Sequence, residues 1–193
     1  MNKQKIELQD GWIIHFPSFL TEDTSNQLFE NLYQTIQWQQ GEIVLFGKKY
    51  ATPRLEAFYA DNQKSYGYSG QRLITHEFTR ELNEIRQKIS LKIDTTFNSV
   101  LLNLYRTGND SNGWHADNEP ELGKNPIIAS LSLGATRRFD LKHNTTKEQH
   151  SFHLNHGSLL IMGGELQHHW KHQIAKTKKV NDPRINLTFR NII

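Results

Sequence analysis

Apolar residues in two segments of the first half of the chain recur every three or four positions, which is the spacing of one helix face. The first segment can begin at a Thr21 cap and runs to about residue 38, and the second covers about residues 75–92. The apolar positions are Leu28, Phe29, Leu32, Tyr33 and Ile36 in the first segment and Phe78, Leu82, Ile85 and Ile89 in the second. The first half of the chain therefore predicts two amphipathic helices.

Short apolar runs bounded by turn-forming residues predict strands elsewhere in the chain. Residues 12–16 and 43–46 have this pattern in the first half, whereas residues 50–70 are polar and irregular. From residue 99 onward, the runs cover residues 99–105, 127–133, 138–141, 150–154, 158–162, 167–173 and 185–189. Consecutive strands without intervening helices favour a β-sandwich or barrel over alternating βαβ units. We therefore expect an α+β fold with the helices packed on one face of a sandwich, in a single domain.

Composition narrows the chemistry that such a domain can carry. The 193 residues include no cysteine, so neither disulfides nor thiolate metal ligands are available. A bound metal would be held by imidazole and carboxylate groups, which suit iron, zinc or manganese. The net charge of +3 and the isoelectric point near 9.0 favour a polyanionic partner but do not establish one.

Hydropathy along the chain argues against a membrane partner. The mean hydropathy is −0.69, and no apolar run approaches the roughly 20 residues that a membrane helix needs. No apolar stretch like that of a signal peptide follows the polar N-terminus. We expect a monomer in the cytosol, or in the nucleus of a eukaryote.

His115 and Asp117 form the one His-x-Asp motif of the chain. In an extended segment, residues two apart point to the same face, so both side chains can reach one ion. Iron(II) oxygenases use two histidines and one carboxylate on one face of an octahedron, which leaves positions open for co-substrate and oxygen. A lone His-x-Asp is common in proteins without metal, so a third ligand must support it. Strand alternation over residues 167–173 leaves His168 and His172 as the candidates.

The last predicted strand alternates between two kinds of side chain. Ile185, Leu187 and Phe189 face one way. Arg184, Asn186, Thr188 and Arg190 face the other. A half-exposed strand gives the same alternation. Two arginines could instead line a site for a dicarboxylate, because guanidinium binds carboxylate through two hydrogen bonds. Their Cα atoms would lie ~20 Å apart, so the two arginines would have different roles.

Taken together, these motifs resemble the signature of the AlkB-type iron(II)/2-oxoglutarate dioxygenases. The matching segments are His115-x-Asp117, a distant His172, Arg184-x-Asn186-x-Thr188-x-Arg190, and Asn103-Leu104-Tyr105 upstream of the metal motif. Residues 128–134 and 157–162 extend the resemblance, which is close from about residue 99 to the C-terminus and looser before it. No single segment is specific, but their order and separations together are.

The resemblance implies a fold, a metal site and a co-substrate. The fold would be a double-stranded β-helix, or jelly roll, over about residues 99–193, preceded by helices and a nucleotide-recognition region over about residues 1–98. His115, Asp117 and His172 would bind iron, and the offset from Arg184 selects His172 over His168. Arg184 would pair with the distal carboxylate of 2-oxoglutarate and Arg190 would lie near its metal-bound end. Four further residues, Asn103, Tyr105, Asn186 and Thr188, would complete that site.

The resemblance also implies a substrate: N-alkylated bases in DNA, with RNA as a second polymer. Oxygen would convert 2-oxoglutarate to succinate, and the oxidised alkyl group would leave as an aldehyde. Residues that would contact the nucleic acid are Phe46, Gly47, Lys48, Arg54, Tyr66, Gly67, Tyr68 and Asn118. Phe46 would fill the gap left by a flipped base, unless it is an apolar core residue at a strand end. Asn118 stands where many relatives have an acidic residue, which leaves the preferred lesion open.

Three other functions are compatible with parts of the pattern. The same iron site could oxidise a protein, a lipid or a small molecule. A nucleic-acid-binding protein with a vestigial metal site is a candidate from another class, although the intact set of ligands and arginines argues against it. A zinc hydrolase could use the same three ligands, but it gives no role to Arg184 and Arg190.

Overall fold

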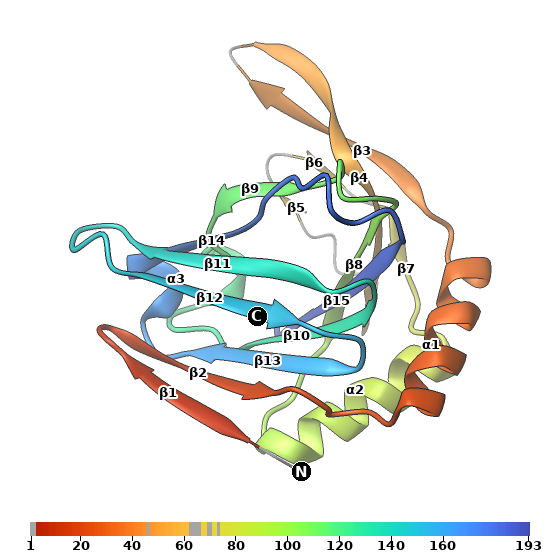
Figure 1. The fold of residues 1–193 in the computed structure, drawn as a ribbon, viewed down its shortest axis with the longest axis horizontal. Helices are drawn as coiled ribbons and strands as arrows, with labels where there is room; N and C mark the ends of the chain where they lie inside the picture. Colours follow the sequence, from red (N-terminus) through yellow and green to blue (C-terminus); the bar gives the residue numbers. More distant parts are fainter. Residues whose placement is uncertain (1–2, 46, 62–66, 69–70, 73) are drawn as a thin grey trace.

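The computed structural model describes residues 3–45, 47–61, 67–68, 71–72 and 74–193. Within these residues two sheets face each other as a sandwich, and their strand pairs are antiparallel apart from a short β4–β7 pair (Figure 1). The larger sheet has, in spatial order, β1 (Gln4–Leu8), β2 (Gly11–Phe16), β13 (Ser158–Gly163), β10 (Ile128–Gly134), β15 (Arg184–Arg190), β8 (Ser99–Tyr105), β4 (Lys48–Ala60) and β3 (Gln39–Leu45), with β7 (Thr75–His76) beside β4. The smaller sheet has the order β12 (Gln149–Leu154), β11 (Arg137–His143), β14 (Trp170–Ile174) and β9 (Asn112–His115), and β5 (Gly67–Tyr68) pairs with β6 (Gln71–Arg72). This is a jelly-roll core.

Alternation along the central strands divides their side chains between two hydrophobic layers. On β10, Leu131 belongs to a cluster shared with the helices, whereas Ile128 belongs to a cluster shared with the smaller sheet. On β13, Leu159 and Leu160 divide in the same way. The sheet is therefore apolar on both faces, which is the pattern of a central layer that is covered from both sides.

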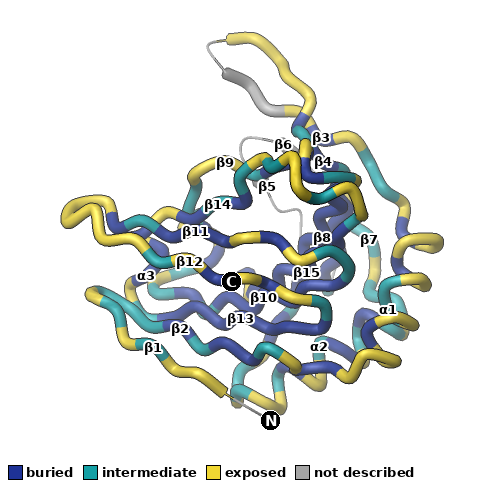
Figure 2. The backbone as a smooth tube through the Cα atoms, in the orientation of Figure 1, coloured by how far each residue is buried: buried dark blue, intermediate teal, exposed yellow. Residues whose placement is uncertain are grey.

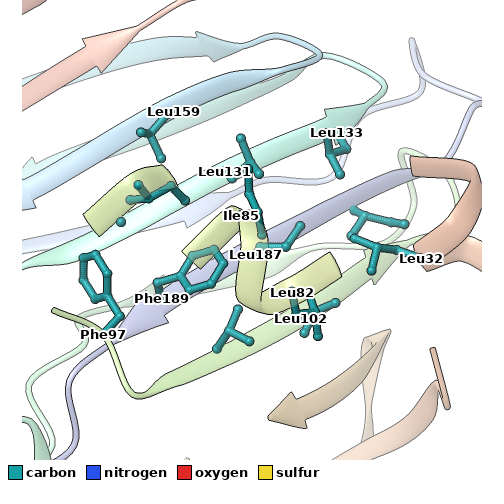
Figure 3. Packing of buried hydrophobic residues seen from close by; sticks show 14 of the residues in the cluster. Leu32, Leu82, Ile85, Phe97, Leu102, Leu131, Leu133, Leu159, Leu187 and Phe189 are labelled. Carbon is teal, nitrogen blue, oxygen red and sulfur yellow. The ribbon is translucent and has the colours of Figure 1, made fainter. Parts of the chain in front are cut away.

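Helices α1 (Glu22–Thr35) and α2 (Arg80–Ile93) supply the outer layer. Figure 3 shows Leu32 of α1 and Leu82 and Ile85 of α2 in the same buried cluster as Leu131 and Leu187 of the larger sheet. Two shorter helical turns, α3 (Leu166–His169) and the 3-10 turn η2 (Pro120–Leu122), lie between strands.

Both predicted helices are present, but their ends differ from the prediction. Thr21 is the N-cap of α1, and its hydroxyl accepts a hydrogen bond from the Thr24 amide. The helix ends at Thr35 rather than near residue 38, because Ile36 is already extended. The second helix begins at Arg80 rather than residue 75, because Thr79 is its N-cap and the preceding residues form β7.

Two strand predictions were wrong, for different reasons. Residues 50–70 were expected to be irregular, but β4 extends to Ala60 and buries polar side chains at Thr52, Arg54 and Glu56. A strand with buried polar residues lacks the apolar alternation that marks a strand in a sequence. The segment 167–173 begins as the helical turn α3, and the strand starts only at Trp170.

The exposed parts of the molecule lie mainly at its edges (Figure 2). The β3–β4 hairpin projects from the body of the sandwich, and its residues from Gly47 to Ala51 are exposed. Among the described residues, no helix has the length and apolar character needed to cross a membrane.

Candidate metal centre

His115, Asp117 and His172 come together at the edge of the smaller sheet. His115 on β9 and His172 on β14 are direct cross-strand partners, and their ring centroids lie 4.2 Å apart. Asp117 lies two residues beyond the end of β9. One ligand atom from each residue lies within 4.8 Å of the other two, so the three side chains can hold one ion. His168, the other candidate for the third ligand, is exposed on α3 and is not part of this group.

The protonation states of the three side chains suit a metal ion. Burial, together with the neighbouring His115, lowers the pKa of His172 to about 3. Burial also lowers the pKa of His115, although Asp117 opposes this shift. Burial alone would raise the pKa of Asp117, but Arg190 and the two histidines bring it down to about 2. Two neutral imidazoles and one carboxylate are therefore ready to donate lone pairs at neutral pH.

Two of the three ligand residues have a buried polar atom without a hydrogen-bond partner among the described residues. Asp117 Oδ1 and His172 Nδ1 make no hydrogen bond within the described part of the chain. A buried carboxylate oxygen and a buried imidazole nitrogen without partners are costly unless a ligand satisfies them. The donor set, two histidines and one carboxylate, is that of iron(II) oxygenases, so the residues fit this metal.

Two neighbours hold Asp117 in place. Arg190 at the end of β15 makes an ion pair with Asp117, with 3.0 Å between Nη2 and Oδ2. Gln167 on α3 accepts a hydrogen bond of 2.9 Å from the Asp117 amide through its side-chain oxygen. Asp117 lies outside the β9–β14 ladder, so Gln167 replaces the strand partner that its backbone lacks.

A second group of possible ligands consists of Asp10 in the β1–β2 turn, His143 at the end of β11 and His169 at the end of α3. His143 Nδ1 accepts hydrogen bonds from the amides of Thr145 and Thr146, so this nitrogen carries no proton. The proton of the neutral ring therefore lies on Nε2, which is 3.0 Å from Asp10 Oδ2 and donates to it. A protonated nitrogen has no lone pair for a metal. This group fastens the β1–β2 turn to β11 instead.

The first group opens into a cavity between the two sheets. Its wall contains Leu101, Asn103, Tyr105, Asn112, His115, Asp117, Ser130, Phe139, Met162, His172, Gln173, Ile174, Asn186, Thr188 and Arg190. The polar face of β15 thus lies inside the sandwich, and all seven residues of β15 are buried. This excludes the alternative that the strand is half exposed to solvent.

Arg184 occupies a different position from Arg190. It is 1% exposed and lies outside the cavity wall, with its guanidinium carbon 5.2 Å from the centre of the Tyr105 ring. Its Nη2 donates to Ser132 Oγ, while Nε and Nη1 make no hydrogen bond within the described residues. Burial lowers the pKa of Arg184 to about 10, so the group still carries its charge at neutral pH. A buried cation with unused donors favours a carboxylate ligand beside Tyr105.

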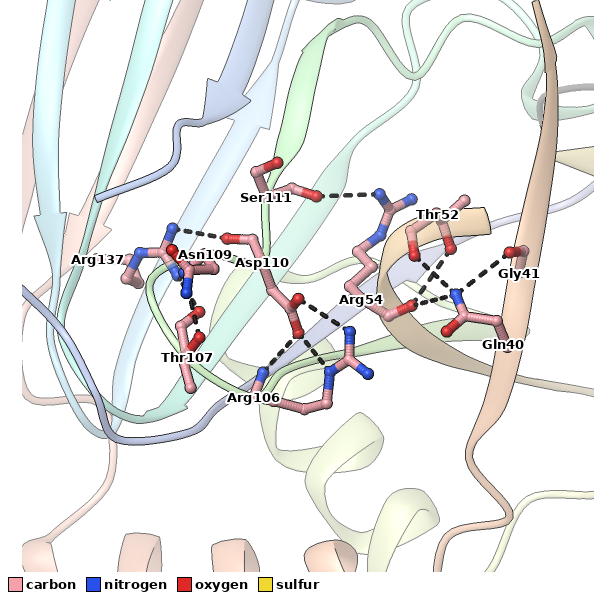
Figure 4. A network of polar contacts seen from close by, with 10 residues as sticks. All are labelled: Gln40, Gly41, Thr52, Arg54, Arg106, Thr107, Asn109, Asp110, Ser111 and Arg137. Carbon is pink, nitrogen blue, oxygen red and sulfur yellow. Dashed lines mark hydrogen bonds and ion pairs between the residues drawn. The ribbon is translucent and has the colours of Figure 1, made fainter. Parts of the chain in front are cut away.

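The loop that leads from β8 to β9 is braced by arginines (Figure 4). Asp110 accepts hydrogen bonds from both the backbone amide and the guanidinium of Arg106. Burial alone would raise the pKa of Asp110, but these bonds to Arg106 lower it. Arg137 donates to the carbonyls of Thr107, Asp110 and Ala175. These contacts fix the direction in which the chain enters β9 and hence His115.

The residues predicted to contact nucleic acid are spread over different surroundings. Gly47 and Lys48 are exposed on the β3–β4 hairpin, and Asn118 is exposed one residue after Asp117. Gly67 and Tyr68 form β5. Phe46 and Tyr66 lie outside the described residues. Arg54, in contrast, is 3% exposed and reaches Asn103 rather than solvent.

Sequence reasoning missed several residues of the centre. Asn112, Ser130 and Gln173 line the cavity, and Gln167 holds Asp117. Asn112 lies three residues before His115, so its closeness to the motif was the available signal. Gln167 gave no such signal, because its role arises from the turn α3, which the strand prediction excluded.

Comparisons with known proteins agree with this geometry. Residues 13–190 match the 2OG-Fe(II) oxygenase superfamily. The human protein "Alpha-ketoglutarate-dependent dioxygenase alkB homolog 3" is 36% identical over 186 residues, which cover 92% of this chain and 65% of that protein. The human "DNA oxidative demethylase ALKBH2" is 36% identical over 180 residues, which cover 88% of this chain and 69% of that protein. The chain thus spans about two thirds of the length of these relatives.

A solved structure shares the fold. "The structure of OsALKBH1" superimposes with a TM-score of 0.64 at 20% sequence identity, and the alignment covers 97% of this chain and 100% of that one. Because the match to the superfamily extends over nearly the whole length and the two human relatives are both AlkB homologues, the chain belongs to the 2OG-Fe(II) oxygenase superfamily as an AlkB-type member.

Proposed function

We propose that the protein removes alkyl groups oxidatively from N-alkylated bases of DNA, with RNA as a second polymer, and uses iron(II), 2-oxoglutarate and oxygen. The observation that carries the proposal is the group of His115, Asp117 and His172 in a cavity flanked by two buried arginines. The name of one relative, the human DNA oxidative demethylase ALKBH2, supports the nucleic-acid substrate.

The metal would supply the oxidation, and the three ligand residues would hold the metal. Iron(II), bound with 2-oxoglutarate and oxygen, supplies the oxidation that converts an N-alkyl carbon into a hydroxyalkyl group, which then leaves as an aldehyde. His115 and His172 offer neutral nitrogens, and Asp117 offers the one negative charge. The ion pair with Arg190 keeps this carboxylate ionised and directed. These three side chains would hold the metal, and a set of two histidines and one carboxylate would leave room for co-substrate and oxygen.

A dicarboxylate co-substrate matches the two arginines. Arg184 lies under Tyr105 and retains its charge, so it suits the carboxylate far from the metal. Arg190 lies beside Asp117, so it suits the end of the co-substrate that is near the metal. Asn103, Asn186 and Thr188 line the wall between them and offer neutral hydrogen-bonding groups.

The nucleic acid would approach along the exposed hairpin. Gly47 and Lys48 lie on the projecting β3–β4 hairpin, and Asn118 is exposed next to the metal ligand. A lysine at this place can contact a phosphate, and the net charge of +3 favours a polyanion. Asn118 retains a hydrogen-bond acceptor for the base but lacks a carboxylate charge.

The test is a mass measurement on N-methylated oligonucleotides incubated with the protein, iron(II) and 2-oxoglutarate. We expect loss of one methyl group per modified base, and no loss when 2-oxoglutarate is omitted. A panel of methylated peptides, lipids and small molecules is assayed in parallel. Succinate formation with a member of that panel, while every oligonucleotide keeps its methyl groups, would move the protein to a different oxygenase substrate class.

A further inference from the structure

A buried ion pair lies at the base of the β3–β4 hairpin. Arg54 and Glu56 are on the same face of β4, are 3% and 2% exposed, and have 2.5 Å between Nη2 and Oε1. Removing two charges from water is costly, and an apolar pair at such a place is often no less stable. The contacts of Arg54 with its other neighbours indicate what the pair does.

Arg54 determines the orientation of the Asn103 amide. Its Nε donates a hydrogen bond of 2.6 Å to Asn103 Oδ1. A guanidinium group has donors only, so it can face the oxygen of the amide but not the nitrogen. Because Oδ1 faces Arg54, the Asn103 NH2 group points to the other side of the amide. Asn103 lines the cavity, so this donor is available to an acceptor there.

Glu56 and Gly41 fix Arg54 from the hairpin side. A side chain at Gly41 would displace the Glu56 carboxylate, because an added Cβ would collide with Glu56 Oε2. The ladder between β3 and β4 shifts its register at this point. Gln40 donates to the Arg54 carbonyl, and Arg54 Nη1 donates to the Ser111 carbonyl (Figure 4). Gln40 thus holds the Arg54 backbone, while Glu56, Ser111 and Asn103 hold its guanidinium.

We propose that Arg54 is a positioning residue for the co-substrate, and that it acts by holding the Asn103 NH2 group toward a carboxylate of 2-oxoglutarate. Glu56 balances the charge of Arg54, so the effect comes from hydrogen-bond direction and not from attraction of the diacid. The inference rests on the proposed function for the identity of the co-substrate. It differs from a direct contact with nucleic acid, which the burial of Arg54 does not favour.

The test measures 2-oxoglutarate binding by titration calorimetry to protein loaded with Mn(II), which binds without turnover. Arg54→Lys keeps a charge for Glu56 but cannot keep both the ion pair and the Nε hydrogen bond. We expect about tenfold to a hundredfold weaker binding of 2-oxoglutarate, the effect of one lost hydrogen bond to a charged group, with Mn(II) affinity unchanged. Arg80→Lys is the matched control, because Arg80 is an exposed arginine that also pairs with a glutamate.

A double-mutant cycle with Asn103→Ala separates positioning from a general loss of structure. If Arg54 acts through Asn103, Arg54→Lys has no further effect in the Asn103→Ala background. Should Arg54→Lys fail to fold, Arg54→Met/Glu56→Met removes both charges and replaces it in the cycle. Wild-type affinity in a folded Arg54 variant, or equal weakening in both backgrounds, overturns the inference. If the wild-type protein itself does not bind 2-oxoglutarate, the proposed function fails instead.

Discussion

At the scale of single residues, Gln167 illustrates how an uncharged side chain can set the position of a metal ligand. Asp117 lies beyond the end of β9, where none of the described strands pairs with its backbone. Gln167 is 1% exposed and its side-chain oxygen accepts the Asp117 N–H bond. Its amide nitrogen contacts Met162 Sδ at 3.7 Å, so both ends of the amide have a partner. The direction of the carboxylate thus depends on α3 as well as on β9.

Gln167→Met tests this dependence. The substitution keeps the length of the side chain and leaves the buried Asp117 amide without an acceptor, which should lower the free energy of unfolding by about 1–3 kcal/mol. We expect Mn(II) affinity, followed by electron paramagnetic resonance, to fall by about tenfold or more, as for other groups that orient a metal ligand. His168→Ala, at an exposed neighbour on α3, is the control. Equal Mn(II) affinity in Gln167→Met and wild type would contradict the role given to Gln167.

The predictable part of the site lies on strands or within two residues of a strand end. Alternation along β15 predicted which face carries Arg184 and Arg190, and spacing of two predicted that His115 and Asp117 can meet. The choice between His168 and His172 could not come from alternation, because the first residues of that segment form a helical turn. Burial of Arg54 was not predictable either, since its partners lie on β8 and in the β8–β9 loop, far away in the sequence.

At the scale of elements, His156 connects α1 to the turn between β12 and β13. Its Nδ1 accepts a hydrogen bond of 2.7 Å from the Gly134 amide, so Nε2 carries the proton and donates to Asn26 Oδ1 on α1. Burial lowers the pKa of His156 from its usual 6.5, and Glu22 on α1 opposes this shift. Protonation of Nδ1 would break the bond to Gly134, so the neutral ring is the form that fits.

This contact predicts a pH dependence of stability. Because the folded pKa is lowered, the unfolded chain binds a proton first as the pH falls below about 6.5, and stability is lost through the lowered folded pKa. His156→Asn keeps an acceptor near the Gly134 amide but does not titrate. Urea unfolding between about pH 7.5 and 5.5 should therefore show a smaller loss of stability for this variant than for wild type. If the stability of the two proteins fell equally over this pH range, the loss could not be assigned to protonation of His156.

At the scale of the whole molecule, the possible metal ligands lie in a cavity between the two sheets, and the β3–β4 hairpin projects from the sandwich. Sequence patterns predicted the succession of strands after residue 99, and the structure confirms strands there. They did not predict β1, a polar edge strand, or the full length of β4, which carries buried polar residues toward the site. The order of strands in the sheets could not be predicted from hydrophobic periodicity either. It depends on which strands pair across long stretches of sequence, such as β8 with β15.

The hairpin predicts a difference between duplex and single-stranded substrates. Phe46 lies outside the described residues, between β3 and β4, and the resemblance assigns it to the gap left by a flipped base. Phe46→Ala should slow demethylation of a duplex by about tenfold, the effect of one lost stacking contact, and leave a single strand unaffected. Tyr50→Ala, an exposed aromatic residue on the same hairpin, is the matched control. Equal losses on both substrates would indicate a core residue instead.

The central claim is that His115, Asp117 and His172 hold an iron ion that couples 2-oxoglutarate to dealkylation of a base. The most direct measurement compares formaldehyde and succinate released from an N-methylated oligonucleotide by wild type and by Asp117→Asn, with Mn(II) binding measured on both proteins. Wild type should release formaldehyde only together with succinate, and Asp117→Asn should release neither and bind Mn(II) weakly. Methyl loss that persists in folded Asp117→Asn, or wild-type protein that binds metal but releases no formaldehyde from any methylated strand, would contradict the claim.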